Sequence, residues 1–205
     1  MLESRIQQQF FDSADLAVQV AENLARPIAQ ATEMLVGCVT AGGKILLAGL
    51  GPAMADAQRY AAYLCGCFER QRPALPSLVL ASDAATLSSL TLAGPAFEPL
   101  KSGVMLGLVR QMQALAMPGD VLVLLCGCDD LAAWQPLIHA AHEKELSLIV
   151  FASGSPAATS HALQEKDVLI TVPSRRLSRI YEVHQLAWHC LCDAIDHQLL
   201  GEEDL

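Results

Sequence analysis

Five short apolar runs, separated by stretches of helical sequence, constrain the fold most. They cover residues 44–48, 78–80, 121–125, 146–151 and 168–172. Short runs of Val, Leu and Ile are typical of strands that are buried on both faces. Parallel pairing of such strands needs helical crossovers that cover the sheet. The pattern therefore predicts an α/β fold, a three-layer αβα domain with a five-stranded parallel sheet.

The remaining sequence supplies the helices. We expect them near residues 52–68, 84–93, 100–116, 131–144, 157–163 and 178–200. Before the first strand, apolar residues recur at helical spacing over residues 3–24, and Pro27 suits the first turn of a second helix that ends near Val39. These patterns predict a single domain over residues 1–205, with an N-terminal helical hairpin (1–40) followed by an α/β core and C-terminal helix (44–200).

The composition limits the cellular compartment in which the protein is expected and the classes of partner that it can bind. The chain is 53% hydrophobic and 17% charged, which excludes extensive disorder, and its net charge of −9 opposes direct binding of nucleic acid or of an anionic membrane. No apolar run approaches the ~20 residues that span a bilayer, and the first residues lack the pattern of a signal peptide. Seven cysteines, an odd number, fit a reducing compartment. We expect a cytoplasmic protein.

Six of the cysteines form three Cys-x-Cys pairs. Residues two apart on a helix point to different sides, so the pairs at 65/67 and 190/192 are poorly placed to hold one ion. The pair Cys126 and Cys128 follows a predicted strand and has the better geometry for a metal or for redox chemistry. Buried apolar thiols are the alternative interpretation. We expect no metal and no cofactor.

The loops that follow the strands are the candidate ligand pocket, because ligands of open parallel sheets bind beyond the carboxyl ends of the strands. The turn after the first strand, Gly49-Leu50-Gly51, is a weak phosphate-binding signal, since Pro52 lacks an N–H donor and Ala53 lacks a hydroxyl. A tight turn that permits close helix–strand packing is the alternative. The pocket candidates in these loops are Gly49, Gly51, Ala53, Ser82, Asp83, Cys126, Asp129, Asp130 and Ser174.

Several motifs in these loops and in the predicted helices resemble one family. They are Ala55-Asp56-Ala57-Gln58, Ser82-Asp83, Val172-Pro173-Ser174, Arg179 with Glu182 and His184, and Cys190-Leu191-Cys192-Asp193. Together they resemble the SIS (sugar isomerase) domain, in the subfamily that includes bacterial phosphoheptose isomerases and the replication initiator-associating protein DiaA. The resemblance covers nearly the whole chain. It implies a homotetramer and isomerisation of sedoheptulose 7-phosphate.

The phosphate anchor of the resembled isomerases is altered in this chain. In the first loop, Leu50, Pro52 and Ala53 stand where the isomerases carry Asn, Gly and Ser. The loop after the third strand has lost its hydroxyls and gained Asp129 and Asp130, whose charges would repel a phosphate. We therefore expect no binding of a sugar phosphate in the family manner. The two acids also suit a second role, as caps of the following helix.

The catalytic positions implied by the resemblance are altered too. Arg59 and Tyr63 stand where the isomerases carry His and Glu, and Tyr181 stands where they carry Gln. His184 is the only retained catalytic candidate, and Tyr181 lies three residues before it on one helix face. These two residues complete the candidate pocket. A structural hydrogen-bonding role for His184 is the alternative. His139 and His142 lack an evident partner and are interpreted as surface residues.

The main hypothesis is a catalytically silent, DiaA-like homotetramer that binds a replication initiator protein as a multivalent scaffold. Leu199 and Leu200 are the predicted partner-binding residues, and a staple of the last helical turn is their alternative role. Two further functions stay open. One is a diverged phosphoheptose isomerase that uses His184. The other is a sensor of a carbohydrate derivative or of a cationic small molecule, bound at Asp83, Asp129 and Asp130.

Overall fold

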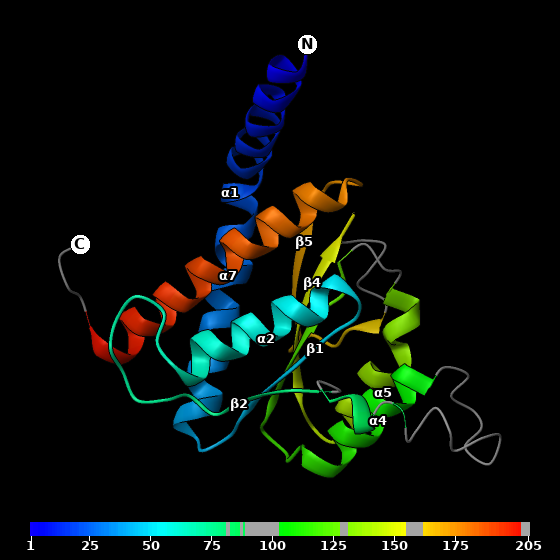
Figure 1. Cartoon of the computed structure of the whole chain (residues 1–205). Coiled ribbons are helices and arrows are strands. Elements are labelled where there is room, and N and C mark those ends of the chain that lie inside the picture. The colour runs from blue at the N-terminus through cyan, green and yellow to red at the C-terminus, as the bar shows by residue number, and fades with distance from the viewer. Residues whose placement is uncertain (81–82, 87, 89–102, 128–130, 155–161, 202–205) are drawn as a thin grey trace.

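The computed structural model contains a five-stranded, wholly parallel sheet (Figure 1). It describes residues 1–80, 83–86, 88, 103–127, 131–154 and 162–201. The spatial order is β2-β1-β3-β4-β5. The strands are β1 (Ile45–Gly49), β2 (Ser77–Val79), β3 (Val121–Leu125), β4 (Ser147–Ser153) and β5 (Val168–Val172). The predicted α/β class and the five parallel strands are confirmed.

Helices cover both faces of the sheet. On one face lie α1 (Leu2–Thr40), α2 (Pro52–Cys65) and α7 (Leu177–Leu200). On the other face lie α4 (Gly103–Leu115) and α5 (Gln135–Glu143). A short turn of helix, η2 (Leu131–Trp134), precedes α5. The strands divide their side chains between these layers. Ile45 and Leu47 face the first layer, whereas Leu46 and Ala48 face the second. This alternation explains why every residue of β1 and β3 is buried.

The N-terminal region is one continuous helix, so the predicted helical hairpin is wrong. Pro27 lies inside α1 and has no N–H to donate to the helix. The helix nevertheless continues because both of its halves are held against the same layer. Leu24 is buried before the proline, and Ala31 and Leu35 are buried after it. This packing outweighs the local cost of the proline.

The other boundaries lie close to the expected ones. α2 ends at Cys65, three residues before the predicted end, and the chain turns at Gly66. The helix expected over residues 157–163 falls almost entirely outside the described residues, as does most of the one expected over 84–93. None of the helices in the described ranges has the length and apolar character needed to cross a bilayer.

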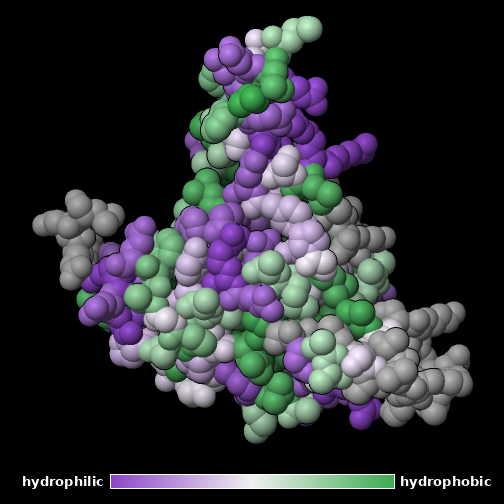
Figure 2. Space-filling view, in the orientation of Figure 1, coloured by the Kyte–Doolittle hydropathy of each residue, from purple (hydrophilic) through white to green (hydrophobic). Residues whose placement is uncertain are grey.

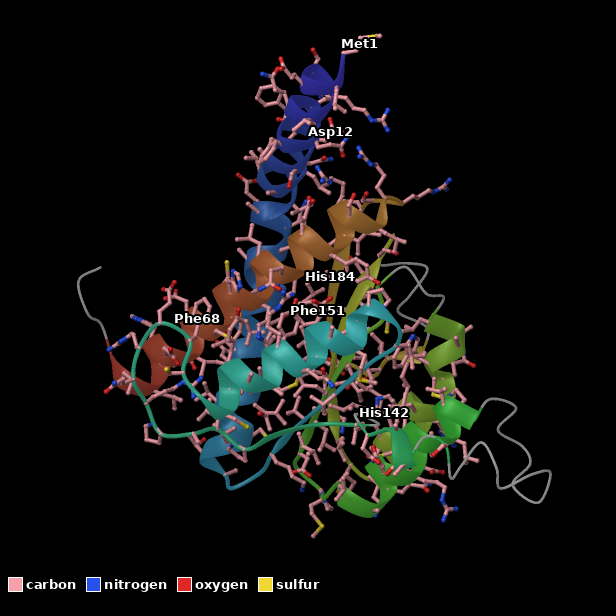
Figure 3. All side chains as sticks on the ribbon, viewed as in Figure 1. Met1, Asp12, Phe68, His142, Phe151 and His184 are labelled. Carbon is pink, nitrogen blue, oxygen red and sulfur yellow. The ribbon has the colours of Figure 1, made fainter. Side chains whose placement is uncertain are left out.

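The first turns of α1 project beyond the rest of the domain (Figure 1). In the space-filling view, apolar side chains stand among polar ones on this projecting end (Figure 2). Asp12 lies on α1 near the start of α7 (Figure 3). The Asp12 carboxylate accepts a hydrogen bond from Arg176 at 2.6 Å, and Ser13 donates to Glu182 at 2.7 Å. These contacts fix the direction of the projecting helix relative to α7.

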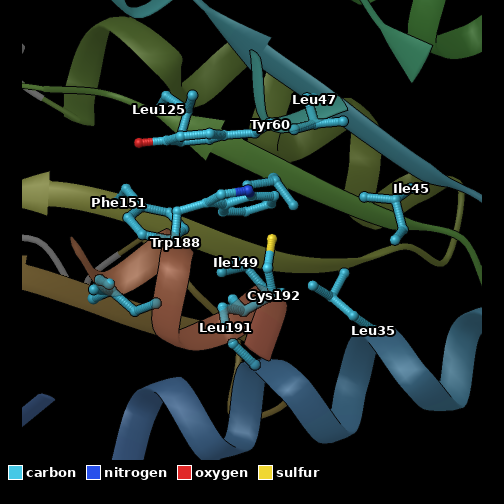
Figure 4. Packing of buried hydrophobic residues seen from close by; sticks show 14 of the residues in the cluster. Leu35, Ile45, Leu47, Tyr60, Leu125, Ile149, Phe151, Trp188, Leu191 and Cys192 are labelled. Atoms are coloured by element: carbon cyan, nitrogen blue, oxygen red, sulfur yellow. The ribbon is translucent and has the colours of Figure 1, made fainter. Parts of the chain in front are cut away.

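Stacked aromatic rings hold α7 against α2 and the sheet (Figure 4). The rings of Tyr60 and Trp188 are nearly parallel, at 10°, with centroids 4.3 Å apart. Phe151 on β4 lies 5.8 Å from Trp188, ring centre to ring centre. Each large aromatic side chain buries a large apolar area, and paired rings add about 0.5–1.5 kcal/mol beyond that burial. The cluster sets the position of α7 across the sheet.

A buried ion pair joins the loop after α2 to the end of α7. Arg72 Nε donates to Asp196 Oδ1 at 2.5 Å, and both side chains are almost fully buried. The same guanidinium donates to the backbone carbonyls of Leu64 and Tyr63, both at 2.8 Å, and so caps the end of α2. The Asp196 Oδ2 atom has no partner among the described residues, so this carboxylate depends on Arg72 for its compensation.

Removal of Arg72 is therefore expected to destabilise the fold strongly. The variant Arg72→Met leaves a buried carboxylate uncompensated and should lower the free energy of unfolding by about 3–5 kcal/mol. The matched control is Arg59→Met, which removes an exposed ion pair with Asp56 and should cost less than about 1 kcal/mol. Urea unfolding at one fixed protein concentration measures both. Equal effects of the two substitutions would contradict the structural role of Arg72.

Candidate functional site

The candidate site lies where β1 and β3 are neighbours. From β1 the chain passes to α2 on one face of the sheet, and from β3 it passes to η2 and α5 on the other face. The two loops therefore diverge at the carboxyl ends of adjacent strands. Such switch points are the usual ligand sites of open parallel sheets. The predicted pocket residues Gly49, Gly51, Ala53 and Cys126 lie at this switch point, at or directly after the ends of β1 and β3.

In the loop after β1, the end of the strand lies very close to the first turn of α2. A Cβ atom on Gly49 would lie 2.4 Å from the carbonyl oxygen of Ala53, so only glycine fits there. Gly51 has a φ of +56°, in the left-handed region that glycine adopts without cost. Both glycines serve the turn itself. This agrees with the tight-turn interpretation.

The start of α2 offers few donors to an anion. Pro52 has no N–H, the N–H of Ala53 donates to Leu50 O at 3.2 Å, and the N–H of Met54 donates to Gly51 O at 3.1 Å. A helix N-terminus binds phosphate through free N–H groups. The first three positions of this helix therefore contribute little to an anion site.

The loop after β3 meets the side chain of Tyr181. Gly127 has a φ of +58°, and a Cβ atom built on it would lie 3.0 Å from the Tyr181 hydroxyl oxygen. The Cys126 side chain is buried, and its backbone N–H donates to Phe151 O at 2.9 Å. Cys128, Asp129 and Asp130 lie outside the described residues. Their predicted repulsion of phosphate therefore stays a prediction.

His184 is a buried, neutral histidine (Figure 3). Its Nε2 atom lies 3.1 Å from the carbonyl oxygen of Ala152, so Nε2 carries the proton and donates it. The ring stands edge-on to Phe151 with centroids 5.4 Å apart. Burial lowers the pKa of His184 from 6.5 to about 4. The unprotonated Nδ1 atom can accept a proton, but it is a weak base.

Tyr181 and His184 extend from one face of α7 toward the ends of two adjacent strands. Tyr181 reaches the loop after β3, and His184 reaches Ala152 near the end of β4. The helical spacing anticipated the shared face. The contact with Gly127 was not anticipated, although a glycine directly after a buried strand is a signal of close backbone approach.

Asp83 and Ser174, two other predicted pocket residues, are engaged with their local backbone. The Asp83 carboxylate accepts hydrogen bonds from Thr86 N at 2.6 Å and from Gln111 Nε2 at 3.3 Å. The first of these bonds is the main cause of the lowered pKa of Asp83. Ser174 Oγ accepts the N–H of Arg176 at 3.2 Å. Ser82 lies outside the described residues.

Arg59 and Tyr63 on α2 are occupied by other contacts. Arg59 pairs with Asp56 at 2.5 Å. The ring of Tyr63 packs against Phe68, with ring centres 5.2 Å apart, and against His189, at 6.0 Å. Neither residue type supplies a general base near neutral pH. The expectation that these positions do not perform the isomerase proton transfer stays a prediction.

His142 is not a surface residue, contrary to the sequence interpretation. Its Nε2 atom lies 2.7 Å from Asp167 Oδ2, and the Asp167 side chain is fully buried. Asp167 also accepts the N–H of Leu148 at 2.9 Å, so this contact holds α5 to the start of β4. His139 is exposed as expected and lies 3.3 Å from Glu143.

The cysteines differ in exposure. Cys38, Cys126 and Cys192 are buried, and burial raises the pKa of the Cys192 thiol to about 12. Cys65, Cys67 and Cys190 are exposed. Within the described part of the chain, no three His, Cys, Asp or Glu side chains are grouped as a metal site would require. The metal or redox role considered for Cys126 depends on Cys128, which lies outside that part.

Leu199 and Leu200, the predicted partner-binding residues, border a groove of about 380 Å³. Its other wall is formed by residues 72–76, with Val39 and Thr40 at the end of α1. Leu200 is 39% exposed, whereas Leu199 packs partly against the core. Only Leu200 therefore presents a substantial apolar surface.

With this geometry established, the comparisons with known proteins decide the family. The family model described as the SIS domain matches residues 9–153. The chain belongs to the SIS domain family. The sequence resemblance to this family is thereby confirmed.

The relatives of this SIS protein include curated phosphoheptose isomerases. That of Methylibium petroleiphilum is 45% identical over 205 residues, which are 100% of this chain and 98% of the relative. That of Aromatoleum aromaticum is 40% identical over 98% of this chain and 97% of the relative.

Two solved structures share the complete fold. The phosphoheptose isomerase GmhA of Neisseria gonorrhoeae matches with a TM-score of 0.84 and the phosphoheptose isomerase of Francisella tularensis with 0.85. Each is 30% identical, and each match covers 96% of this chain and 99% of the other. The similarity extends over the N-terminal helix, the sheet and α7.

The buried state of His184 predicts a specific pH dependence. Its pKa is lower in the folded chain than in the unfolded chain, so the unfolded chain takes up the proton first as the pH falls. Stability is complete above pH 6.5 and is lost between pH 6.5 and 4. By pH 4.5 the loss should reach about 2–3 kcal/mol.

Urea unfolding at pH 7.0 and pH 4.5 measures this loss. His184→Gln keeps a donor for Ala152 but does not titrate, so its loss between the two pH values should be smaller by that amount. His139→Gln, at an exposed position, should behave as the wild type. Identical pH dependence of wild type and His184→Gln would contradict the burial of a neutral imidazole.

Proposed function

We propose that this protein is a diverged sugar-phosphate isomerase of the phosphoheptose type, with sedoheptulose 7-phosphate as its substrate and His184 as its base. The observation that carries the proposal is the 45% identity, over the whole chain, with a protein named phosphoheptose isomerase. The 30% identical structures with the same name support it, since each match covers 96% of this chain.

The burial and the hydrogen bond of His184 determine how fast the proposed isomerisation is expected to be. Isomerisation by proton transfer needs a base within hydrogen-bond reach of the sugar. Nδ1 of His184 is unprotonated at neutral pH, because Nε2 holds the proton against Ala152 O. However, a base with a pKa of about 4 transfers protons less effectively than one near 7. Together with the poor donors at the start of α2, this predicts slow turnover.

A specific observation favours a second function, an assembly scaffold of the DiaA type. Three exposed apolar residues, Leu2, Ile6 and Phe10, recur every four positions along the projecting end of α1. They form one stripe on the helix. We name Leu2, Ile6 and Phe10 the α1 ridge. An exposed apolar stripe on a projecting helix is typical of a surface that another chain covers.

The stripe continues into an apolar groove between α1 and α7. The groove has a volume of about 290 Å³ and is lined by residues that include Ala17, Ala21, Leu24, Val183, Leu186 and Cys190. The proposed occupant of the groove is a second copy of this chain, as part of a homotetramer. The α1 ridge of that copy supplies apolar side chains that can cover the apolar lining of the groove. In this second proposal, Leu199 and Leu200 contact a replication initiator protein.

The sensor hypothesis gains no support from the described residues. Asp83 is engaged by Thr86 and Gln111, and Asp129 and Asp130 lie outside the described part. Binding of a carbohydrate derivative without turnover therefore stays a prediction.

The isomerase proposal is tested by incubating the protein with sedoheptulose 7-phosphate in D₂O. Proton transfer between adjacent carbons introduces deuterium, which mass spectrometry detects even when turnover is slow. We expect incorporation by the wild type and a loss of about 10²–10⁴-fold in His184→Gln, the usual contribution of a general base. His139→Gln is the control and should retain the wild-type rate.

An inert wild type, at protein concentrations equal to the substrate, would refute the isomerase proposal. Equal exchange by wild type and His184→Gln would refute the role of the histidine instead.

The scaffold proposal predicts that the α1 ridge holds the assembly together. The double variant Ile6→Ser/Phe10→Ser should form smaller species than the wild type, as measured by light scattering after size-exclusion chromatography. Both side chains are exposed, at 50% and 72%, so the fold itself should be unaffected. Met117→Ser, at a position 62% exposed beyond α4, is the control. A wild-type protein that is monomeric in solution would refute the scaffold proposal.

A further inference from the structure

A groove of about 490 Å³ lies along β5, the strand at one end of the sheet. Leu169 and Thr171 of β5 line it together with Pro173, and α1 contributes Gln19 and Asn23. Its volume is within the range of ligand sites in proteins, about 300–1,000 Å³. The strand β4 separates β5 from β3, so this groove is distinct from the switch point between β1 and β3.

The peptide groups of β5 alternate in direction. The carbonyl oxygen of Val172 accepts the N–H of Gly154, just beyond the end of β4, at 2.9 Å, so the peptide groups of Val172 point toward β4. Successive residues of a strand direct their N–H and C=O groups to opposite sides, so those of Thr171 and Leu169 point away from β4. No strand in the described ranges pairs with that outer edge. Two donors and two acceptors are therefore directed to the side where the groove lies.

The side chains of Gln19 and Asn23 add two amides to the same groove. Both are exposed, and neither amide has a hydrogen-bond partner within the described part of the chain. They are four positions apart on α1, so they lie on one face of the helix, about 6 Å apart along its axis. In an extended chain, peptide groups on the same edge recur every two residues, about 6.6–6.8 Å. The spacing of the two amides thus matches an extended polypeptide.

We propose that this groove binds an extended, uncharged segment of a partner polypeptide, which adds to the sheet as a strand beside β5. Its backbone exchanges hydrogen bonds with Leu169 and Thr171, and the amides of Gln19 and Asn23 bind the peptide groups of its other edge. Main-chain hydrogen bonds provide the affinity in strand addition of this kind. A charged segment is disfavoured, because the described residues that line the groove include no charge to pair with it.

Hydrogen exchange measured by mass spectrometry tests the proposal, with the capped pentapeptide acetyl-VTVTV-amide as the probe. The N–H groups of Leu169 and Thr171 should exchange rapidly in the free protein and become protected when the peptide binds. The protection should appear in the fragment that covers residues 164–176. A peptide with the same side chains, N-methylated at every residue, cannot donate a backbone N–H and should protect neither group. Equal protection by both peptides, or none by the unmethylated peptide at millimolar concentration, would overturn strand addition.

The double variant Gln19→Ala/Asn23→Ala tests the contribution of α1. Loss of two neutral hydrogen bonds should weaken peptide binding by about 5–100-fold, as measured by titrating the protection of the same fragment. Gln30→Ala is the matched control, because it removes an exposed amide of α1 that does not line the groove. An unchanged affinity of the double variant would refute the groove as the binding site.

The same measurement distinguishes a partner from a second copy of this chain. Without peptide, the exchange of Leu169 and Thr171 should not depend on the protein concentration. Protection that increases with protein concentration would assign the edge of β5 to a contact between copies of the chain and would overturn the proposal of a separate partner.

Discussion

The stack of Trp188 on Tyr60 is the contact on which the rest of the structure depends, because it fixes α7 across the sheet. The start of the helix holds α1 through Arg176, and its end holds the loop after α2 through Asp196. Between these points, Tyr181 and His184 face the ends of the central strands. A single helix, α7, the last one in the sequence, thus positions both termini and the candidate site. A shift of α7 would disturb all of them together.

The packing that positions His184 also weakens it as a base. Its ring is removed from water and its Nε2 proton is held by a backbone carbonyl, so protonation becomes unfavourable and the pKa falls to about 4. A negative charge brought close to a buried imidazole favours the protonated form and raises the pKa again. A bound phosphorylated sugar carries such a charge. In the proposed complex, this charge would oppose the effect of burial on the pKa of His184.

The sequence allowed the fold class, the five strands and most of the helices to be predicted, because apolar runs and helical periodicity are local signals. It failed at Pro27, where the rule that proline begins a helix was overridden by burial of Leu24 and Ala31 on either side. For the glycines of the β1 loop, the tight turn that the sequence analysis kept as the alternative agrees with the structure. The ion pairs of Arg72 and His142 and the contact of Tyr181 with Gly127 join residues from 25 to 124 positions apart. Such contacts leave no local pattern in a single sequence.

The two proposed functions use different faces of α7. Tyr181, His184 and Trp188 follow each other at spacings of three and four residues and face the sheet, whereas Val183, Leu186 and Cys190 follow the same rhythm and line the groove with α1. Substitutions on one face need not alter the other. The proposed chemistry at the ends of β3 and β4 could therefore change while the proposed assembly surface is kept. Divergence of the isomerase site and retention of a scaffold are, in this geometry, independent events.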